Sequence, residues 1–203
     1  MNRTLTTTET LAQAILPRRG WLAYPLVADT LLVVLGSLFV ALSAQIRISL
    51  MPFSPVPITG QTLGVLLVGS LLGPRLGFAA LLLYLIEGAI GLPFFAGGKS
   101  GYTHLFGVTG GYLISFPIAA ALTGWLATWG WDRRFLTTVA SMALASLVIY
   151  VIGATWLAFF IGPVDAIVKG VLPFLVGDAI KIALAAVALP GGWQVLKWFR
   201  RER

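Results

Sequence analysis

The amino-acid sequence predicts an all-α membrane protein with six transmembrane helices. Hydrophobic residues make up 58% of the 203 residues and charged residues only 10%, whereas an ordinary soluble domain has about 25% charged residues. The apolar residues are also gathered in six runs, most of them near the roughly 20 residues that a helix needs to cross a bilayer. The runs cover residues 27–45, 58–73, 76–92, 109–129, 135–161 and 170–189.

The distribution of the basic residues predicts the orientation of these helices in the membrane. Six spans put both termini on one side of the membrane, and cytoplasmic segments carry an excess of Lys and Arg. If both termini are cytoplasmic, only three of the 14 basic residues lie outside, namely Arg47, Lys99 and Lys169. Lys181 lies within the last apolar run, and the other ten are cytoplasmic. We therefore expect a multi-pass protein of the cell membrane with cytoplasmic N and C termini. The net charge of +7 then reflects topology in the lipid bilayer, not binding to nucleic acid.

The chain is expected to divide into three regions. Residues 1–26 form a cytoplasmic N-terminal segment, residues 27–190 a six-helix transmembrane substrate-binding domain, and residues 191–203 a basic cytoplasmic tail. The sequence has no Cys and a single His, His104. A disulfide framework and a thiolate metal site are therefore excluded, and we expect neither a metal nor a cofactor.

The first three runs differ in length and in the polar residues that they carry. Run 27–45 places Ser37 and Ala41 at the small-xxx-small spacing that lets two helix backbones approach closely. This face could dock a partner helix, but packing inside the chain is the interpretation that we favour. Run 58–73 is short for a crossing and is expected to tilt or to begin inside the preceding loop. Run 76–92 carries Tyr84 and, near its end, Glu87, for which we expect solvation at the interface.

A Pro-rich stretch at 47–62 is expected on the outer side, where it could cap an external pocket. Pro52, Pro55 and Pro57 fix three backbone angles and remove three N–H donors, so that no regular helix can form there. The result is a stiff, irregular loop. Thr59 and Gln61 supply side chains that could hydrogen-bond a ligand beneath it.

A Gly-rich stretch at 93–108 is expected on the same side. Its Gly-Gly-Lys-Ser segment resembles the end of a phosphate-binding P-loop, but Pro93 stands where that motif requires its first Gly. A nucleotide site is therefore excluded. Gly97 and Gly98 instead allow the backbone to approach a small ligand closely, and Tyr102 lies nearby in the sequence.

The last run contains the strongest functional signal. Asp178 and Lys181 lie near the middle of run 170–189, and a charged residue at the centre of a transmembrane helix costs about 2.5–3.5 kcal/mol. Such residues are functional-site candidates. Because they are three positions apart, they share one helix face. We expect both to face an internal cavity that opens outward, with an ion pair that only locks helix packing as the alternative.

Six motifs occur in order: PVPITGQTL at 55–63, LGPRLG at 72–77, LY at 83–84 with GAIGLP at 88–93, FAGG at 95–98, TGGYL at 109–113 and GDAIK at 177–181. In this order the sequence closely resembles the BioY family, the biotin-specific S components, or substrate-capture subunits, of energy-coupling factor (ECF) transporters. The resemblance covers about residues 27–189. Two positions depart from it: Val108, where many members have Pro, and Glu87, where the residue is usually apolar.

The resemblance implies a prokaryotic membrane protein that binds biotin with high affinity from outside and works in its uptake. Its partners would be a membrane coupling subunit and two ABC ATPases, so that ATP hydrolysis lies in the partners and this chain is not an enzyme. A homo-oligomer is expected if it acts alone. The resemblance places Asp178, Lys181, Gly97, Gly98 and Tyr102 at the biotin pocket.

The residue types fit biotin without requiring it. Asp178 can accept hydrogen bonds from ureido N–H groups, Lys181 can donate to a carbonyl or carboxylate, and Tyr84 or Tyr102 can pack on the rings. Another small vitamin that is an acid or a zwitterion would fit equally. An intramembrane enzyme with Asp178 as general base lacks a second catalytic group. A structural or channel-like helix bundle is the remaining alternative.

Overall fold

The computed structural model describes residues 10–15 and 24–201, and these residues are mostly helical. Predictions for most of segment 1–26 and for the last two residues therefore lie outside the described chain. The long helices are α2 (Pro25–Gln45), α3 (Gln61–Leu72), α4 (Pro74–Ala89), α6 (Gly110–Thr128), α7 (Phe135–Ile161) and α9 (Leu175–Arg201). The short ones are α1 (Leu11–Ile15), α5 (Tyr102–Leu105), α8 (Pro163–Gly170), η2 (Trp131–Arg133) and η3 (Leu172–Phe174).

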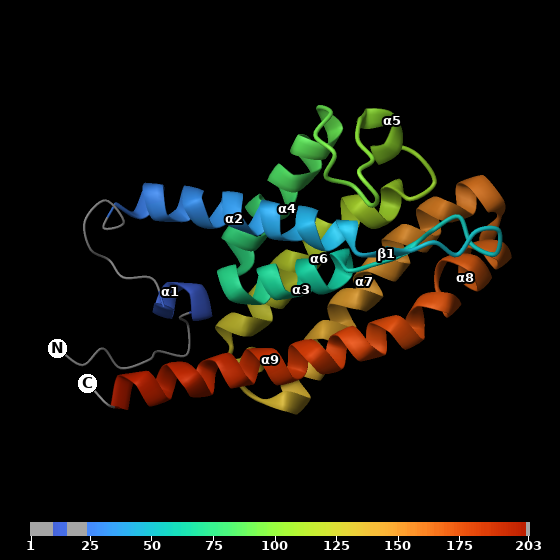
Figure 1. The fold of residues 1–203 in the computed structure, drawn as a ribbon. Helices are drawn as coiled ribbons and strands as arrows, with labels where there is room; N and C mark the ends of the chain where they lie inside the picture. Colours follow the sequence, from blue (N-terminus) through green and yellow to red (C-terminus); the bar gives the residue numbers. More distant parts are fainter. Residues whose placement is uncertain (1–9, 16–23, 202–203) are drawn as a thin grey trace.

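Helix α6 lies at the centre of the bundle and packs against α3, α4 and α7 (Figure 1). Small residues allow these close approaches. A Cβ atom added to Gly69 of α3 would lie 2.3 Å from the carbonyl oxygen of Ala120 in α6, so only glycine fits there. The core around α6 is apolar, with Leu81 of α4 and Met142 of α7 fully buried.

Four of the described segments are long and apolar enough to cross a membrane. They are α2, α6, α7 and the segment Pro163–Phe199 that contains α8 and most of α9. Helices α3 and α4 have 12 and 16 residues, which at 1.5 Å per residue gives roughly 18 and 24 Å. All six predicted apolar runs contain a helix, and the short second run begins as a strand, since α3 starts only at Gln61.

The Pro-rich stretch forms a hairpin that lies beside α8 (Figure 1). Its two short strands, β1 (Arg47–Ile48) and β2 (Ile58–Thr59), are antiparallel, with Arg47 opposite Thr59. The connection 49–57 is irregular, as three prolines predict. The Ser54 hydroxyl donates a 2.6 Å hydrogen bond to the carbonyl oxygen of Lys169 in α8. The hairpin is thereby attached to the α7–α9 side of the molecule.

The predicted run 170–189 is not one helix. Gly170 ends α8, η3 follows, and α9 then continues from Leu175 to Arg201, through the residues expected to form a separate tail. At the far end of α9 the indole of Trp193 donates a 2.6 Å hydrogen bond to Oδ2 of Asp132 in η2. Both residues are almost fully buried. Burial raises the pKa of the Asp132 carboxyl, against the opposing effects of the Trp193 hydrogen bond and the Arg133 charge.

Candidate functional site

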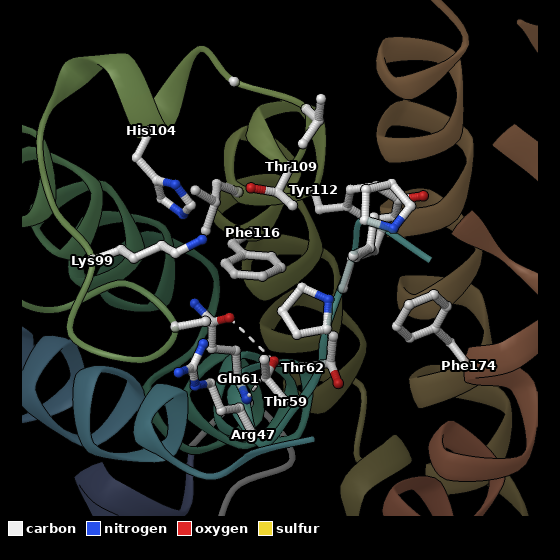
Figure 2. Close-up of a pocket in the computed structure, with 18 of the residues that line it drawn as sticks. Arg47, Thr59, Gln61, Thr62, Lys99, His104, Thr109, Tyr112, Phe116 and Phe174 are labelled. Atoms are coloured by element: carbon white, nitrogen blue, oxygen red, sulfur yellow. Dashed lines mark hydrogen bonds between the residues drawn. The ribbon is translucent and has the colours of Figure 1, made fainter. Parts of the chain in front are cut away.

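A cavity of about 190 Å³ lies where the hairpin and the Gly-rich loop meet α6, α7 and α9. Figure 2 labels side chains of the hairpin, the Gly-rich loop, α3, α6 and η3 around one space; none of its labelled residues comes from α7 or α9. The polar lining includes Arg47, Thr59, Gln61, Thr62, Lys99, Thr103, His104, Thr109, Tyr150, Asp178 and Lys181. The apolar and aromatic lining includes Pro55, Val56, Pro57, Val108, Tyr112, Leu113, Phe116, Ile149 and Phe174.

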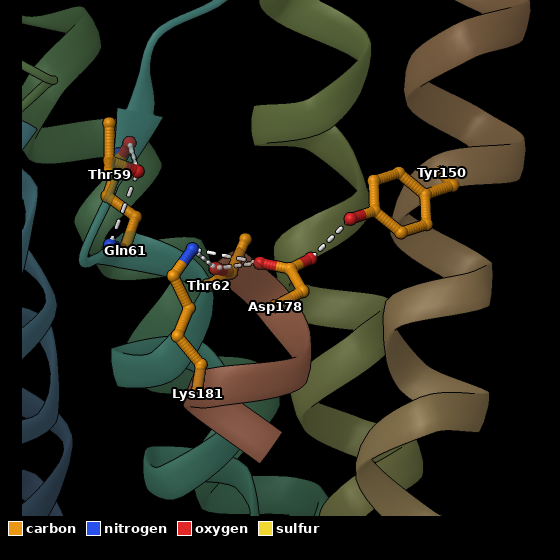
Figure 3. Close-up of polar contacts among 6 residues, drawn as sticks. All are labelled: Thr59, Gln61, Thr62, Tyr150, Asp178 and Lys181. Carbon is orange, nitrogen blue, oxygen red and sulfur yellow. Dashed lines mark hydrogen bonds and ion pairs between the residues drawn. The ribbon is translucent and has the colours of Figure 1, made fainter. Parts of the chain in front are cut away.

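Asp178 and Lys181 form an ion pair at the wall of this cavity (Figure 3). Nζ of Lys181 lies 2.9 Å from Oδ1 of Asp178 and donates a 2.7 Å hydrogen bond to Oγ1 of Thr62. The Tyr150 hydroxyl donates a 2.5 Å hydrogen bond to Oδ2 of Asp178. The two charges therefore neutralise each other, as in the packing alternative, and both also line the cavity, as the ligand-binding hypothesis requires.

Thr59 and Gln61 line the cavity from the hairpin side, whereas Tyr84 does not. The Tyr84 side chain is fully buried. Its hydroxyl accepts a 2.5 Å hydrogen bond from Nε2 of Gln61 and donates one of 3.2 Å to the carbonyl oxygen of Phe94. The Thr59 hydroxyl in turn donates to Oε1 of Gln61 at 3.1 Å. Tyr84 thus positions the Gln61 amide from behind instead of packing on a ligand.

The structure places Gly97, Gly98 and Tyr102 outside the cavity lining. Gly97 has a φ of +72°, and a Cβ there would lie 2.3 Å from Cζ of Arg47. The Gly98 amide donates a 3.0 Å hydrogen bond to Oε1 of Gln45. Tyr102 is 69% exposed. The two glycines do allow a close backbone approach, but to Gln45 at the end of α2 and to the Arg47 guanidinium in β1.

Three cationic side chains line the cavity against one acid among the described residues, Asp178. Two of them, Arg47 and Lys99, come from the covering loops, and the third is Lys181. In the sequence, the positions of Arg47 and Lys99 indicate only the orientation of the helices in the membrane. The excess of positive charge favours a ligand that carries a negative group.

His104 lies beside these cations on α5. Its ring packs against that of Phe95 with the centroids 5.4 Å apart. Burial, and then the charge of Lys99, lower the pKa of His104. The imidazole is therefore neutral at pH 7, and it can donate or accept a hydrogen bond inside the cavity.

Ser37 and Ala41, the candidate residues for docking a partner helix, are buried within the described chain. The Ser37 hydroxyl donates a hydrogen bond to the carboxylate of Glu87 in α4, which gives Glu87 a partner inside the chain where only interfacial solvation was expected. The α2 face that carries Ser37 packs on α3 and α4. This position corresponds to internal packing, the interpretation favoured from the sequence.

Comparisons with known proteins agree on one family. The family model of BioY matches residues 8–198. The probable biotin transporter BioY of Pyrococcus horikoshii is 46% identical over 157 residues, covering 75% of this chain and 90% of that protein. Biotin transporter BioY2 of Lactococcus lactis is 38% identical over 162 residues, covering 77% of this chain and 85% of the relative.

A solved structure shares the fold. The crystal structure of the S-component for biotin from an ECF-type ABC transporter superposes with a TM-score of 0.71 at 26% identity, covering 82% of this chain and 90% of that one. Sequence motifs, family model and fold thus lead to the same conclusion. This chain belongs to the BioY family and is a multi-pass protein of the cell membrane.

Proposed function

We propose that this protein captures biotin in the cavity between the hairpin, the Gly-rich loop and α9, as the substrate-binding subunit of an ECF-type transporter. The observation that carries the proposal is the nearly buried Asp178–Lys181 pair, which lines a cavity in a member of a family whose relatives are named biotin transporters. Another small vitamin with an acidic group is the alternative that the cavity chemistry leaves open.

The cavity offers different partners to the two ends of biotin. We assign the ureido ring to the network of Asp178, Thr62 and Tyr150, because a carboxylate with a free lone pair accepts from N–H groups. The valerate carboxylate is assigned to Arg47 and Lys99 on the covering loops, because guanidinium and ammonium groups bind carboxylates through charge-assisted hydrogen bonds. The apolar bicyclic body would then contact aromatic side chains of the lining, Tyr112, Phe116 and Phe174.

We further propose that all six long helices cross the membrane, with α3 and α4 as short or tilted spans. Both termini are then cytoplasmic and the cavity faces outward. Within the described residues three basic residues lie at the cavity side, Arg47, Lys99 and Lys169, whereas six lie at the opposite side, Arg75, Arg133, Arg134, Lys197, Arg200 and Arg201. The three-region division at residues 26 and 190 becomes a functional division only, because α9 runs across the second boundary.

The energy for uptake must come from partners in this proposal. A coupling subunit in the membrane and two ABC ATPases would supply it, since the Gly-rich segment 97–100 lacks the first Gly of a P-loop. A homo-oligomer is the arrangement expected if the chain transports without them. The protein itself binds and releases biotin without chemical turnover.

The decisive experiment is to purify the protein in detergent, denature it and identify the released small molecule by mass spectrometry. We expect biotin at one molecule per chain, and titration of vitamin-free protein should give the same stoichiometry with no product formed. A different vitamin in the released material would support the alternative. Absence of any bound vitamin, together with no binding of added biotin, would refute the capture function.

A further inference from the structure

Helix α8 divides its surface among three environments. At about 3.6 residues per turn, Val164, Ile167 and Val168 form one stripe, and they are 73%, 54% and 48% exposed. A second face is buried against the bundle through Ala166 and Gly170. A third face carries Asp165 and Lys169, which form an ion pair with 2.8 Å between Nζ and Oδ2.

The position of α8 indicates what covers its apolar stripe. Helix α7 is one of the segments able to cross a membrane, and its last turn exposes Phe159 and Phe160 by 84% and 50%. Only Gly162 separates the end of α7 from the start of α8, a path of under about 8 Å between the flanking Cα atoms. The exposed stripe of α8 therefore begins next to the lipid-facing end of α7.

We propose that α8 is an interfacial helix whose stripe of Val164, Ile167 and Val168 lies in the lipid at the cavity-side membrane surface. An interfacial helix lies in the membrane plane with its apolar side among the upper acyl chains and its charged side toward water. The ion-paired face of α8 supplies the second part of that arrangement. The partner is thus the bilayer itself.

The position of α8 in the membrane surface would also affect the hairpin over the cavity. Ser54, which is buried, hydrogen-bonds the carbonyl oxygen of Lys169 in α8. A helix held at a fixed depth in the lipid would therefore hold one end of the cavity cover at a fixed height. The lipid contact of α8 does not depend on which ligand the cavity binds.

The absence of Cys from the sequence makes the proposal directly testable. Val164→Cys and Ile167→Cys would each be labelled with an environment-sensitive fluorophore and reconstituted in phosphatidylcholine vesicles. Asp165→Cys, on the ion-paired face, is the matched control, and Leu147→Cys, which is 57% exposed in the middle of α7, marks the deep lipid. Size-exclusion chromatography would first establish that each labelled variant is folded.

We expect labels at 164 and 167 to be quenched about twofold more by phospholipids with a nitroxide high on the acyl chain than by those with it near the chain end. Leu147→Cys should show the reverse order, and Asp165→Cys should be quenched mainly by aqueous iodide. The proposal is overturned if the labels at 164 and 167 respond to iodide as Asp165→Cys does. It is equally overturned if nitroxide lipids leave them unquenched while Val164→Cys cross-links two copies of the chain.

Discussion

The Tyr150 hydroxyl donates a 2.5 Å hydrogen bond to Oδ2 of Asp178, across the boundary between α7 and α9. The other carboxylate oxygen, Oδ1, already contacts Nζ of Lys181 at 2.9 Å. Asp178 is only 7% exposed, so that each contact is made in a medium where water competes weakly. Tyr150 and Lys181 together fix the orientation of the carboxylate, and the Thr62 hydroxyl also donates a 3.4 Å hydrogen bond to Oδ1. Of the roughly four acceptor sites of a carboxylate, one on Oδ2 is then left for a ligand N–H group.

Replacing Tyr150 by Phe should weaken biotin binding about tenfold, because a hydrogen bond to a charged group contributes roughly 1.5–3 kcal/mol. The aromatic ring, which packs against the apolar core, is retained, so the folded yield should not change. Isothermal titration of purified, vitamin-free protein measures the effect. Tyr102→Phe is the matched control, since Tyr102 is 69% exposed and outside the cavity lining. Equal affinities of the Tyr150→Phe and Tyr102→Phe variants for biotin would show that the Tyr150 hydroxyl does not contribute to binding.

Asp178→Asn should weaken biotin binding at least tenfold while the protein still folds. The amide keeps the shape of the carboxylate, but it removes the acceptor charge and leaves Lys181 without its ion-pair partner, which costs about 3–5 kcal/mol for a buried pair. Asp165→Asn, which breaks the exposed ion pair of α8, should leave affinity unchanged. Loss of folded Asp178→Asn protein, with unaltered affinity in the remainder, would show that the pair serves packing alone.

Gly97→Ala and Gly98→Ala should separate backbone strain from displacement of Arg47. Both glycines have a φ of +72°, so each substitution brings a strain of about 1–2 kcal/mol. A Cβ at Gly97 would lie 2.3 Å from Cζ of Arg47, whereas no described atom lies within 4 Å of one at Gly98. We expect a lower affinity for biotin in Gly97→Ala than in Gly98→Ala, with similar thermal stabilities. Biotin methyl ester, which lacks the negative charge, should show a smaller difference.

The charged pair was predictable because Asp178 and Lys181 interrupt an apolar run, and the transfer cost of each charge demands a compensating environment. The role of Tyr150 was not predictable, since a tyrosine in run 135–161 carries no charge to transfer into the membrane. Tyrosine also occurs equally at interfaces and in cores. Its role depends on the packing of α7 against α9, which no local pattern encodes. The six apolar runs located the helices for the same energetic reason that located the charged pair.

Arg47, Lys99 and the two glycines show a second limit. The charges of Arg47 and Lys99 were visible in the sequence, but their approach to the cavity depends on the pairing of β1 with β2 and on the path of the Gly-rich loop. Gly97 was predicted to let the backbone approach a ligand, whereas its close neighbour in the structure is Arg47, 50 residues away in the chain. The burial of Tyr84 behind Gln61 was likewise not predictable from the sequence, because it depends on how α4 packs.

Binding of biotin should strengthen as the pH falls from 7.5 to 5.5, through His104. Burial and Lys99 lower the pKa of this imidazole in the empty protein, so the ligand-free site is neutral at His104 at the upper end of this range. A carboxylate bound beside it raises that pKa, and the complex then takes up a proton that the empty site does not hold. Affinity for an anionic ligand therefore rises toward acid pH, by at most about tenfold per pH unit for one proton.

Arg47 and Lys99 line the same cavity as His104, and a ligand carboxylate stays ionised above about pH 5. His104→Gln keeps a polar side chain of similar reach and cannot titrate. Its biotin affinity should therefore vary less with pH than that of the unmodified protein, and the difference between the two isolates the contribution of His104. Parallel pH profiles for the two proteins would mean that the negative group of the ligand does not lie near His104 on α5. Lys181 would then be the candidate partner for that group.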